Sequence, residues 1–383
     1  MLSKFLIWVK KKIIKNRFGR KIDSRIRVAL NHILSKARTT RANHQTSSSQ
    51  YVFFLYGGLG DILVDARILS AFQKEKKLKI LVLCPREHNA ILKKIGYDFD
   101  VEVYDKNCLI SDALRLRKCV KGYNFFLHQV STEVLFLTLL LGVKITRGFH
   151  KNYRWYIHPD GRIRRIQSPS TQRFDRFKMI MEETFGPLAV APPIRLLKKE
   201  NLSLLLTKAG PATAAGVHSI DLWESVVIGC VDANVRKLSI IGDKSGTETA
   251  KNICRLVAKN HPDLIVSNYV GKTTLSKTID LCSRSDLCIG LDSGLAHLAN
   301  SLNIPTLRIF LFSNPKDFTW GKFSDVFFYK QFNCMPCVSE SLDGIDNYAP
   351  ICSYQFQCSR HINRTHLRKT VSEFINKDEY FIN

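Results

Sequence analysis

The sequence predicts an α/β protein made of two Rossmann-like, doubly wound parallel-sheet domains that face each other across a cleft. Continuous apolar runs such as 51–56 and 287–291 are typical of parallel strands buried on both faces, and residues with helical apolar spacing follow them. Repeated strand–helix units favour a parallel sheet. A Pro-rich break at 186–193 separates two such series, so we expect one domain over 51–190 and a second over 200–375.

The expected elements alternate along both domains. In the first, strands are expected at 51–56, 80–84, 101–104, 125–127 and 144–146, with helices after the first glycine-rich turn and near 89–95, 110–121, 132–141 and 173–185. In the second, strands are expected at 202–206, 237–241, 264–267, 287–291 and 306–310, with helices near 222–231, 247–259, 274–283 and 294–302. Each domain thus has several strand ends that open toward a shared cleft.

The first glycine-rich turn is the segment 57–61, Gly-Gly-Leu-Gly-Asp, between a strand and a helix. Its glycine spacing is not G-x-G-x-x-G, and no acidic residue ends the next strand, 79–84, where a dinucleotide site needs one. The spacing therefore disfavours a nicotinamide cofactor.

A second strand–helix joint, within 288–310, suits an anion. Asp292 and Ser293 stand where a helix N-cap is expected, and Gly294 allows the backbone to turn closely. The amide groups and the positive dipole end of the following helix favour a phosphate. The alternative is an ordinary joint of an α/β domain that binds no ligand.

The charge of the chain points to a polyanionic partner. The 383 residues carry a formal net charge of +25, which attracts nucleic acid, an anionic membrane surface or a phosphorylated substrate. Residues 1–41 contain 13 Lys and Arg against the single acid Asp23, and apolar residues such as Phe5 and Trp8 recur near helical spacing. Residues 1–50 are therefore expected to form a basic amphipathic arm on an anionic membrane, followed by a polar linker. A disordered basic tail is the alternative.

No secretion or membrane-spanning signal is evident. The apolar run 5–9 is too short for a signal peptide and lysines follow it at once. No segment reaches the ~20 apolar residues that a spanning helix needs. We expect a cytoplasmic protein that is peripheral on the inner face of a bacterial inner membrane.

Four motifs together resemble the heptosyltransferases of glycosyltransferase family 9. These motifs are Gly58-Leu59-Gly60-Asp61, the run Asp292-Ser293-Gly294-Leu295-Ala296-His297-Leu298-Ala299, Ile304-Pro305-Thr306, and Trp320-Gly321. The resemblance covers roughly 51–375. It implies a GT-B fold, and an inverting transfer of heptose from ADP-heptose to a lipopolysaccharide core or to another glycan or protein acceptor, with no cofactor required for transfer.

The resemblance also implies roles for single residues. Asp61 would be the general base that takes the proton of the acceptor hydroxyl. Asp292 would contact the donor sugar, the N–H groups of Ser293, Gly294 and Leu295 would hold its diphosphate, and His297 would touch the phosphate or the sugar. The acceptor side of the cleft would include Gly57, Gly58, Gly60 and Gln129. The structural alternatives are a helix N-terminal acid for Asp61 and a capping or packing residue for His297.

Three departures from the family pattern affect the donor side. Where the family has a lysine two residues before the tryptophan of the second domain's first helix, this chain has Asp221 before Trp223. The acid that holds the nucleotide ribose has no matching residue after Gly242, and Glu248 is the nearest candidate. His128-Gln129-Val130 stands where the family often has Asp-Gln-Gly. Candidate replacements for the missing lysine are Lys208, Lys244 and Lys272.

Four late cysteines have the spacing of a metal site. Cys334 and Cys337 form a C-x2-C pair, and Cys352 and Cys358 follow after a loop. Such a set suits a tetrahedral thiolate site for structural zinc or iron. Disulfides, which a cytoplasm disfavours, and plain reduced thiols are the alternatives.

The partners expected are a nucleotide-sugar donor, ADP-heptose, a phosphorylated glycolipid acceptor and, through residues 1–41, an anionic membrane surface. Nucleic acid is not expected, because no nucleic-acid-binding motif occurs in the body of the chain. A family member that binds donor or glycolipid without catalysis, motivated by Asp221, and a nucleic-acid-binding protein remain the alternative functions.

Overall fold

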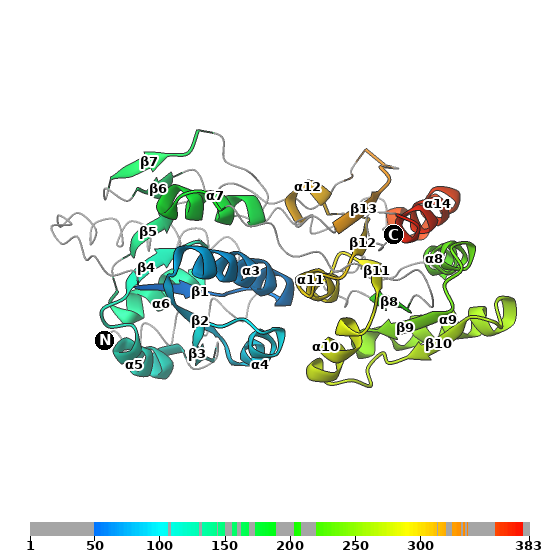
Figure 1. Cartoon of the computed structure of the whole chain (residues 1–383), viewed down its shortest axis with the longest axis horizontal. Coiled ribbons are helices and arrows are strands. Elements are labelled where there is room, and N and C mark those ends of the chain that lie inside the picture. Colours follow the sequence, from blue (N-terminus) through cyan, green and yellow to red (C-terminus); the bar gives the residue numbers. More distant parts are fainter. Residues whose placement is uncertain are drawn as a thin grey trace.

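A computed structural model describes residues 50–105, 109–129, 132–143, 145–149, 155–158, 162–167, 173–188, 203–207, 220–311, 313–318, 324–330, 332–333, 335 and 357–377. The predicted basic arm up to residue 49 lies outside the described residues. Figure 1 shows two lobes side by side, the first coloured blue to green and the second yellow-green to red. No helix in these ranges is long and apolar enough to cross a membrane.

The first lobe is built on a seven-stranded sheet with the order β3-β2-β1-β4-β5-β6-β7. Its strands are β1 (Gln50–Phe54), β2 (Lys79–Pro85), β3 (Asp100–Tyr104), β4 (Asn124–Leu127), β5 (Ile145–Phe149), β6 (Trp155–Ile157) and β7 (Ile163–Arg165). Neighbours from β3 to β5 pair in parallel, as expected, and β6 and β7 extend the sheet with antiparallel pairs. The last two strands were not predicted, because three residues are too few to show a period.

The helices of this lobe are α3 (Leu59–Lys76), α4 (Arg86–Ile95), α5 (Leu109–Cys119), α6 (Thr132–Leu141) and α7 (Arg173–Phe185). Helix α3 begins after Gly58, whose neighbour Gly57 has φ +116°, a conformation that favours glycine. The glycines of the first turn therefore let the chain leave β1 and enter α3 without strain.

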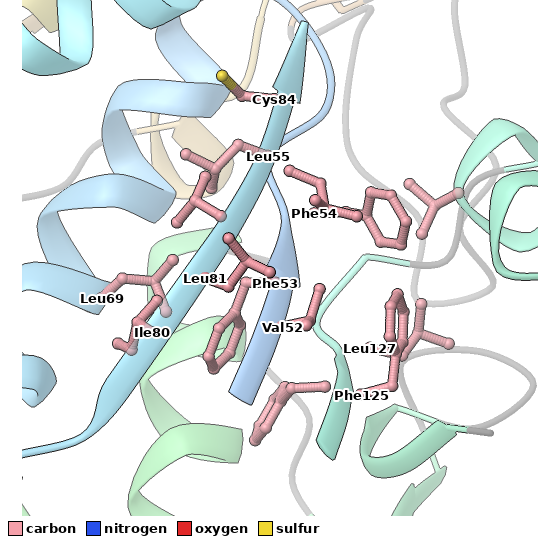
Figure 2. Packing of buried hydrophobic residues seen from close by; sticks show 14 of the residues in the cluster. Val52, Phe53, Phe54, Leu55, Leu69, Ile80, Leu81, Cys84, Phe125 and Leu127 are labelled. Carbon is pink, nitrogen blue, oxygen red and sulfur yellow. The ribbon is translucent and has the colours of Figure 1, made fainter. Parts of the chain in front are cut away.

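Aromatic side chains fill both faces of this sheet. Phe53 and Phe54 leave β1 toward opposite faces, as expected of successive strand residues (Figure 2). The ring of Phe53 stacks on Phe126 at 4.9 Å, and that of Phe54 lies 5.0 Å from Phe125. All four side chains are buried. The continuous aromatic run thus makes β1 a fully buried central strand that fixes the start of α3.

The second lobe is built on an all-parallel six-stranded sheet with the order β10-β9-β8-β11-β12-β13. Its strands are β8 (Ser203–Thr207), β9 (Lys237–Ile241), β10 (Ile265–Asn268), β11 (Leu287–Leu291), β12 (Thr306–Phe310) and β13 (Ser324–Phe328). The strand order reverses between β8 and β11, where ligands bind at the carboxyl ends of strands in such sheets.

The helices of the second lobe are α8 (Ile220–Asp232), the 3₁₀ turn η2 (Lys244–Gly246), α9 (Thr247–Asn260), α10 (Leu275–Ser283), α11 (Gly294–Ser301), α12 (Pro315–Phe318), α13 (Gln357–Arg360) and α14 (Arg364–Ile375). Helix α14 packs closely on α8, because a Cβ at Gly229 would come within 2.8 Å of the Arg368 carbonyl oxygen. The end of the chain thus closes the outer side of this lobe.

The two lobes meet through α3 and α4 of the first and α10 and α11 of the second (Figure 1). A buried apolar cluster crosses the boundary and includes Leu63 and Ile91 from the first lobe and Ile279 and Leu298 from the second. Polar contacts flank it: Arg67 Nη1 donates to the Asn300 carbonyl at 2.8 Å. Lys94 Nζ lies 2.7 Å from Asp280 Oδ1. The amino ends of α3 and α11 are therefore held against each other.

Candidate functional site

A cavity of about 320 Å³ lies where the lobes meet. The size is at the lower end of the range for small-molecule sites, roughly 300–1,000 Å³. Leu59 lines it from the first lobe, and the remaining walls come from the ends of β9 and β11 and the starts of α10 and α11. These walls are Gly242, Asp243, Thr273, Leu275, Thr278, Ser293, Gly294 and Leu295. Three of the predicted donor residues thus line one cavity.

The amino end of α11 forms one wall of this cavity. Ser293 is its N-cap, and the Ser293 hydroxyl accepts from the Ala296 amide at 3.4 Å. Gly294 and Leu295 are the first two helical residues, so their N–H groups have no acceptor within the helix. These groups and the helix dipole make the wall suitable for phosphate oxygens. The predicted N-cap and helix start are both observed.

Asp292 lies directly behind that wall, at the end of β11. Its side chain is 18% exposed, and Ser313 Oγ donates to Oδ2 at 3.1 Å. Oδ1 lies 3.6 Å from both His297 Nε2 and Arg308 Nη1. Burial raises the pKa of this carboxyl, and the charge of Asp61 adds to that rise, whereas Arg308 and the Ser313 hydrogen bond oppose it.

The amino end of α3 approaches from the opposite lobe. Asp61 is in the first turn of α3, and its Oδ2 accepts a hydrogen bond from the Gly58 amide at 2.9 Å. This bond is the helix-capping contact expected from the structural alternative. Gly60, the residue before Asp61, packs against the ring of His297 in the second lobe, so Asp61 lies at the lobe boundary. Capping and a catalytic role are compatible, because the cap holds the carboxylate in one orientation.

Gly60 packs tightly against the second lobe. A Cβ built at Gly60 would lie 2.5 Å from Cδ2 of His297. Gly294 is also tight, since its Cβ would lie 3.2 Å from Cβ of Leu59. Both glycines therefore permit α3 and α11 to pack end to end, and His297 sits buried between them. The role of Gly60 is therefore to leave room for the His297 ring, and not to contact a ligand.

Asp243 is a cavity residue that the sequence analysis missed. It follows Gly242 directly and lines the cavity, and its carboxylate accepts from the Ser245 amide at 2.8 Å at the start of η2. Glu248, the predicted ribose ligand, is 69% exposed and lies 3.6 Å from Arg255 and 3.9 Å from Lys251. Glu248 does not line the cavity, because its position in α9 carries it away from the strand ends. The position immediately after Gly242 was the signal that could have identified Asp243.

Asp221 does not face the cavity either. Its carboxylate forms an ion pair with Arg364 of α14, and Glu224 joins the same arginine at 3.5 Å. The acid at 221 thus serves the contact between α8 and α14. Of the replacement lysines, Lys272 Nζ donates to the Asn268 carbonyl at 3.1 Å. Lys208 lies outside the described residues.

Gln129 is placed inside the first lobe, away from the cavity lining. It is 5% exposed and donates to Asp65 Oδ2, and the same carboxylate oxygen lies 3.2 Å from Nε2 of the buried His128. The His128 ring stacks on Phe177 of α7 at 4.3 Å. This buried polar cluster ties β4 to α3 one turn after Asp61, so Gln129 supports the helix that carries Asp61.

Only one of the four predicted metal ligands falls among the described residues. Cys358 is in α13 and is 4% exposed. Cys334, Cys337 and Cys352 lie outside the described ranges. Within these ranges, no group of three or more His, Cys, Asp or Glu side chains could hold a metal ion.

Comparison with known proteins agrees with this geometry. Residues 235–344, which hold the cavity walls of the second lobe, match the family model "Glycosyltransferase family 9 (heptosyltransferase)". A search of curated protein sequences finds no significant match. The predicted resemblance and the enzyme class, a glycosyltransferase, are confirmed by the family match.

Solved structures of low sequence identity share the fold. The chain superimposes on Escherichia coli ADP-heptose lps heptosyltransferase II with a TM-score of 0.57, 13% identity, and coverage of 86% of this chain and 99% of that one. With E. coli heptosyltransferase WaaC with ADP, the TM-score is 0.54 and the identity 14%, over 72% of this chain and 92% of that one. With the family 9 glycosyltransferase of Veillonella parvula, the TM-score is 0.55 and the identity 12%, over 86% of this chain and 100% of that one. The predicted GT-B architecture is thereby confirmed.

Proposed function

We propose that this chain is a family 9 glycosyltransferase that moves a sugar, heptose, from ADP-heptose to a lipopolysaccharide core or to another glycan or protein acceptor, with inversion at the transferred carbon. One observation carries the proposal: two helix amino ends from different lobes converge on one cavity, each with an aspartate beside it. Two solved relatives are described as an ADP-heptose heptosyltransferase and as a heptosyltransferase with ADP, which supports the choice of donor.

The donor side of the mechanism is electrostatic. The leaving group is a nucleoside diphosphate, which gains negative charge as the glycosidic bond breaks. The N–H groups of Gly294 and Leu295 and the dipole of α11 would stabilise that charge. Asp243, which also lines the cavity, would accept hydrogen bonds from the ribose hydroxyls.

The acceptor side needs one base. An inverting transfer requires a group opposite the leaving diphosphate that removes the proton of the attacking hydroxyl. Asp61 would perform this task, because it stands at the cleft end of α3, across from the amino end of α11. The Gly58 amide that donates to its Oδ2 fixes the orientation of the carboxylate. The base at the amino end of α3 would then lie on one side of the reacting carbon, and the amino end of α11, which holds the leaving diphosphate, would lie on the other.

The test is ADP release by the full-length protein with ADP-heptose and truncated core lipopolysaccharide. Turnover that requires both substrates is expected. Tight ADP-heptose binding without turnover would support the non-catalytic binder and overturn the transferase proposal. Release of UDP or GDP from other nucleotide sugars, with none from ADP-heptose, would retain the enzyme class and replace the donor.

We also propose that the basic arm holds the protein on the cytoplasmic face of the inner membrane, where a phosphorylated glycolipid acceptor is available. The support is the charge and apolar spacing of residues 1–41. Sedimentation with vesicles containing anionic lipid should depend on residues 1–45. Equal sedimentation of the deleted chain would contradict this placement.

Structural zinc or iron at Cys334, Cys337, Cys352 and Cys358 is proposed from their spacing. Such a metal would fix the loop between the two cysteine pairs and take no part in transfer. Elemental analysis of freshly purified protein should give about one metal ion per chain. A chain purified without metal, with all four thiols reactive, would contradict it.

A further inference from the structure

Arg308 is a buried cation, and the only charged residue, in a fully buried strand. It occupies the middle of β12, Thr-Leu-Arg-Ile-Phe, and is 1% exposed. Its partner in the register with β11 is Gly290, two residues before Asp292. Burying a guanidinium is unfavourable unless it is paired, so its partners indicate its purpose.

The partners of Arg308 belong to the donor side of the site. Its Nη1 lies 3.6 Å from Asp292 Oδ1 and 3.3 and 3.4 Å from Nδ1 and Nε2 of His297. Its guanidinium carbon lies 5.4 Å from the ring centre of Phe310. An arginine N–H can only donate, so His297 contacts it as a neutral ring that accepts. Arg308 therefore contacts two of the predicted donor residues, Asp292 and His297, from the side away from the cavity.

The carboxylate of Asp292 needs this cation. Its Oδ1 is buried and accepts no hydrogen bond, while Ser313 serves only Oδ2. The residues that line the adjacent cavity include Asp243 and, among those described, no lysine or arginine. A diphosphate brought to the amino end of α11 would therefore meet carboxylates that lack a compensating cation at the surface of the cavity. A charge behind the wall can supply the compensation, because a low-dielectric interior screens it weakly.

We propose that Arg308 is a positioning residue for the nucleoside-diphosphate donor, offsetting the charge of Asp292 and fixing the ring of His297. This inference rests on the proposed function, since it concerns the same donor. Arg308 touches no cavity surface and acts through Asp292 and His297.

The direction of the pH effect follows from the groups that face Asp292. These are Arg308 from β12, His297 from α11 and Asp61 from α3. Burial lowers the pKa of Arg308 to about 10, so it is charged at neutral pH. Its removal raises the pKa of Asp292 further. A folded-state pKa above the unfolded value gives stability at low pH that is lost as pH rises through it.

The test uses Arg308→Met, Arg308→Lys and Asp292→Asn, with the double variant R308M/D292N. Arg255→Met is the matched control, because Arg255 is 71% exposed and pairs only with residues of α9 among the contacts seen. Two properties are measured for each full-length protein: thermal unfolding between about pH 5 and pH 8, and the Kd of ADP by calorimetry.

The expected results form a thermodynamic cycle. R308M loses stability as pH rises and binds ADP about tenfold or more weakly, whereas R255M behaves as wild type. In the D292N background the same change has little effect on either property, because no carboxylate remains to be compensated. R308K keeps the charge and binds ADP within about threefold of wild type.

Three outcomes would overturn the inference. They are an R308M protein with wild-type ADP affinity and pH profile, equal losses in the presence and absence of Asp292, or an R308K protein as impaired as R308M. If R308M does not fold, two results still test the inference: R308K should bind ADP nearly as well as wild type, and the double variant R308M/D292N should fold. The unfolding cycle needs no substrate, so it stands even where wild type fails to turn over ADP-heptose. Conversely, if wild type turns over ADP-heptose but R308M has the same effect with and without Asp292, only the positioning role of Arg308 is rejected and the proposed function stands.

Discussion

The two strand–turn–helix joints of the site have the same local form and different electrostatics. In the first, Asp61 is inside α3 and accepts from a backbone amide, near the mouth of the cleft. In the second, Asp292 precedes α11 and is packed against Arg308 and His297 behind the cavity wall. A carboxylate held by an amide near solvent suits proton removal, whereas one buried against a cation suits donor positioning. Position relative to the helix start thus separates the two roles that we propose for Asp61 and Asp292.

The largest effect is expected for Asp61→Asn. The amide oxygen of Asn can still accept from the Gly58 amide, so the helix cap survives while basicity is lost. We expect kcat to fall by about 10²- to 10⁴-fold, with ADP affinity and melting temperature close to wild type. Steady-state ADP release and calorimetry measure the two quantities. Asp98→Asn, on the exposed surface of the same lobe, is the control.

An Asp61→Asn protein that keeps its turnover would reduce Asp61 to a capping residue. One that loses turnover and melting temperature together would assign the effect to folding. Either result would remove the contrast between the two joints.

Gly60→Ala gives the next largest effect and tests the contact between the joints. In an unobstructed helix, Ala is more stable than Gly by about 1 kcal/mol. Here the new Cβ would lie 2.5 Å from the His297 ring, so we expect destabilisation by about 1–3 kcal/mol and weaker ADP binding. Chemical denaturation measures the first and calorimetry the second.

Gly58→Ala is the matched control, since its Cβ would meet only Asp61 Oδ2 at 3.7 Å. Replacing the N-cap glycine should lower the free energy of unfolding by at most about 1 kcal/mol and leave the affinity for ADP unchanged. Stabilisation by G60A would show that α3 and α11 do not pack end to end in solution.

The smallest effect is expected for Asp243→Asn on the donor wall. Loss of a charged acceptor should weaken ADP binding about three- to tenfold. Asp221→Asn and Glu248→Gln in the same lobe should leave the Kd unchanged, because their carboxylates face Arg364 and the basic side chains of α9. A loss of affinity in either of these, with none in D243N, would restore the ribose role to Glu248 or a donor role to position 221.

Local patterns predicted the parts of this molecule that depend on neighbours in sequence. The apolar runs gave β1 and β11, and the small polar residues at 292–294 gave the start of α11. The parts that depend on contacts between residues far apart in the sequence could not be predicted from local patterns. The role of Arg308 requires its alignment beside β11, and the pairing of Asp221 requires α14. Gln129 was expected in the cleft, although Asp65 holds it in the interior.

The most direct test of the whole account is the position of ADP in a crystal of the full-length protein. We expect diphosphate oxygens at hydrogen-bond distance, about 2.9 Å, from the amides of Gly294 and Leu295, with the ribose toward Asp243. Asp61 is expected on the opposite side of the terminal phosphate. A diphosphate bound at another surface, or at the amino end of α3 alone, would contradict it.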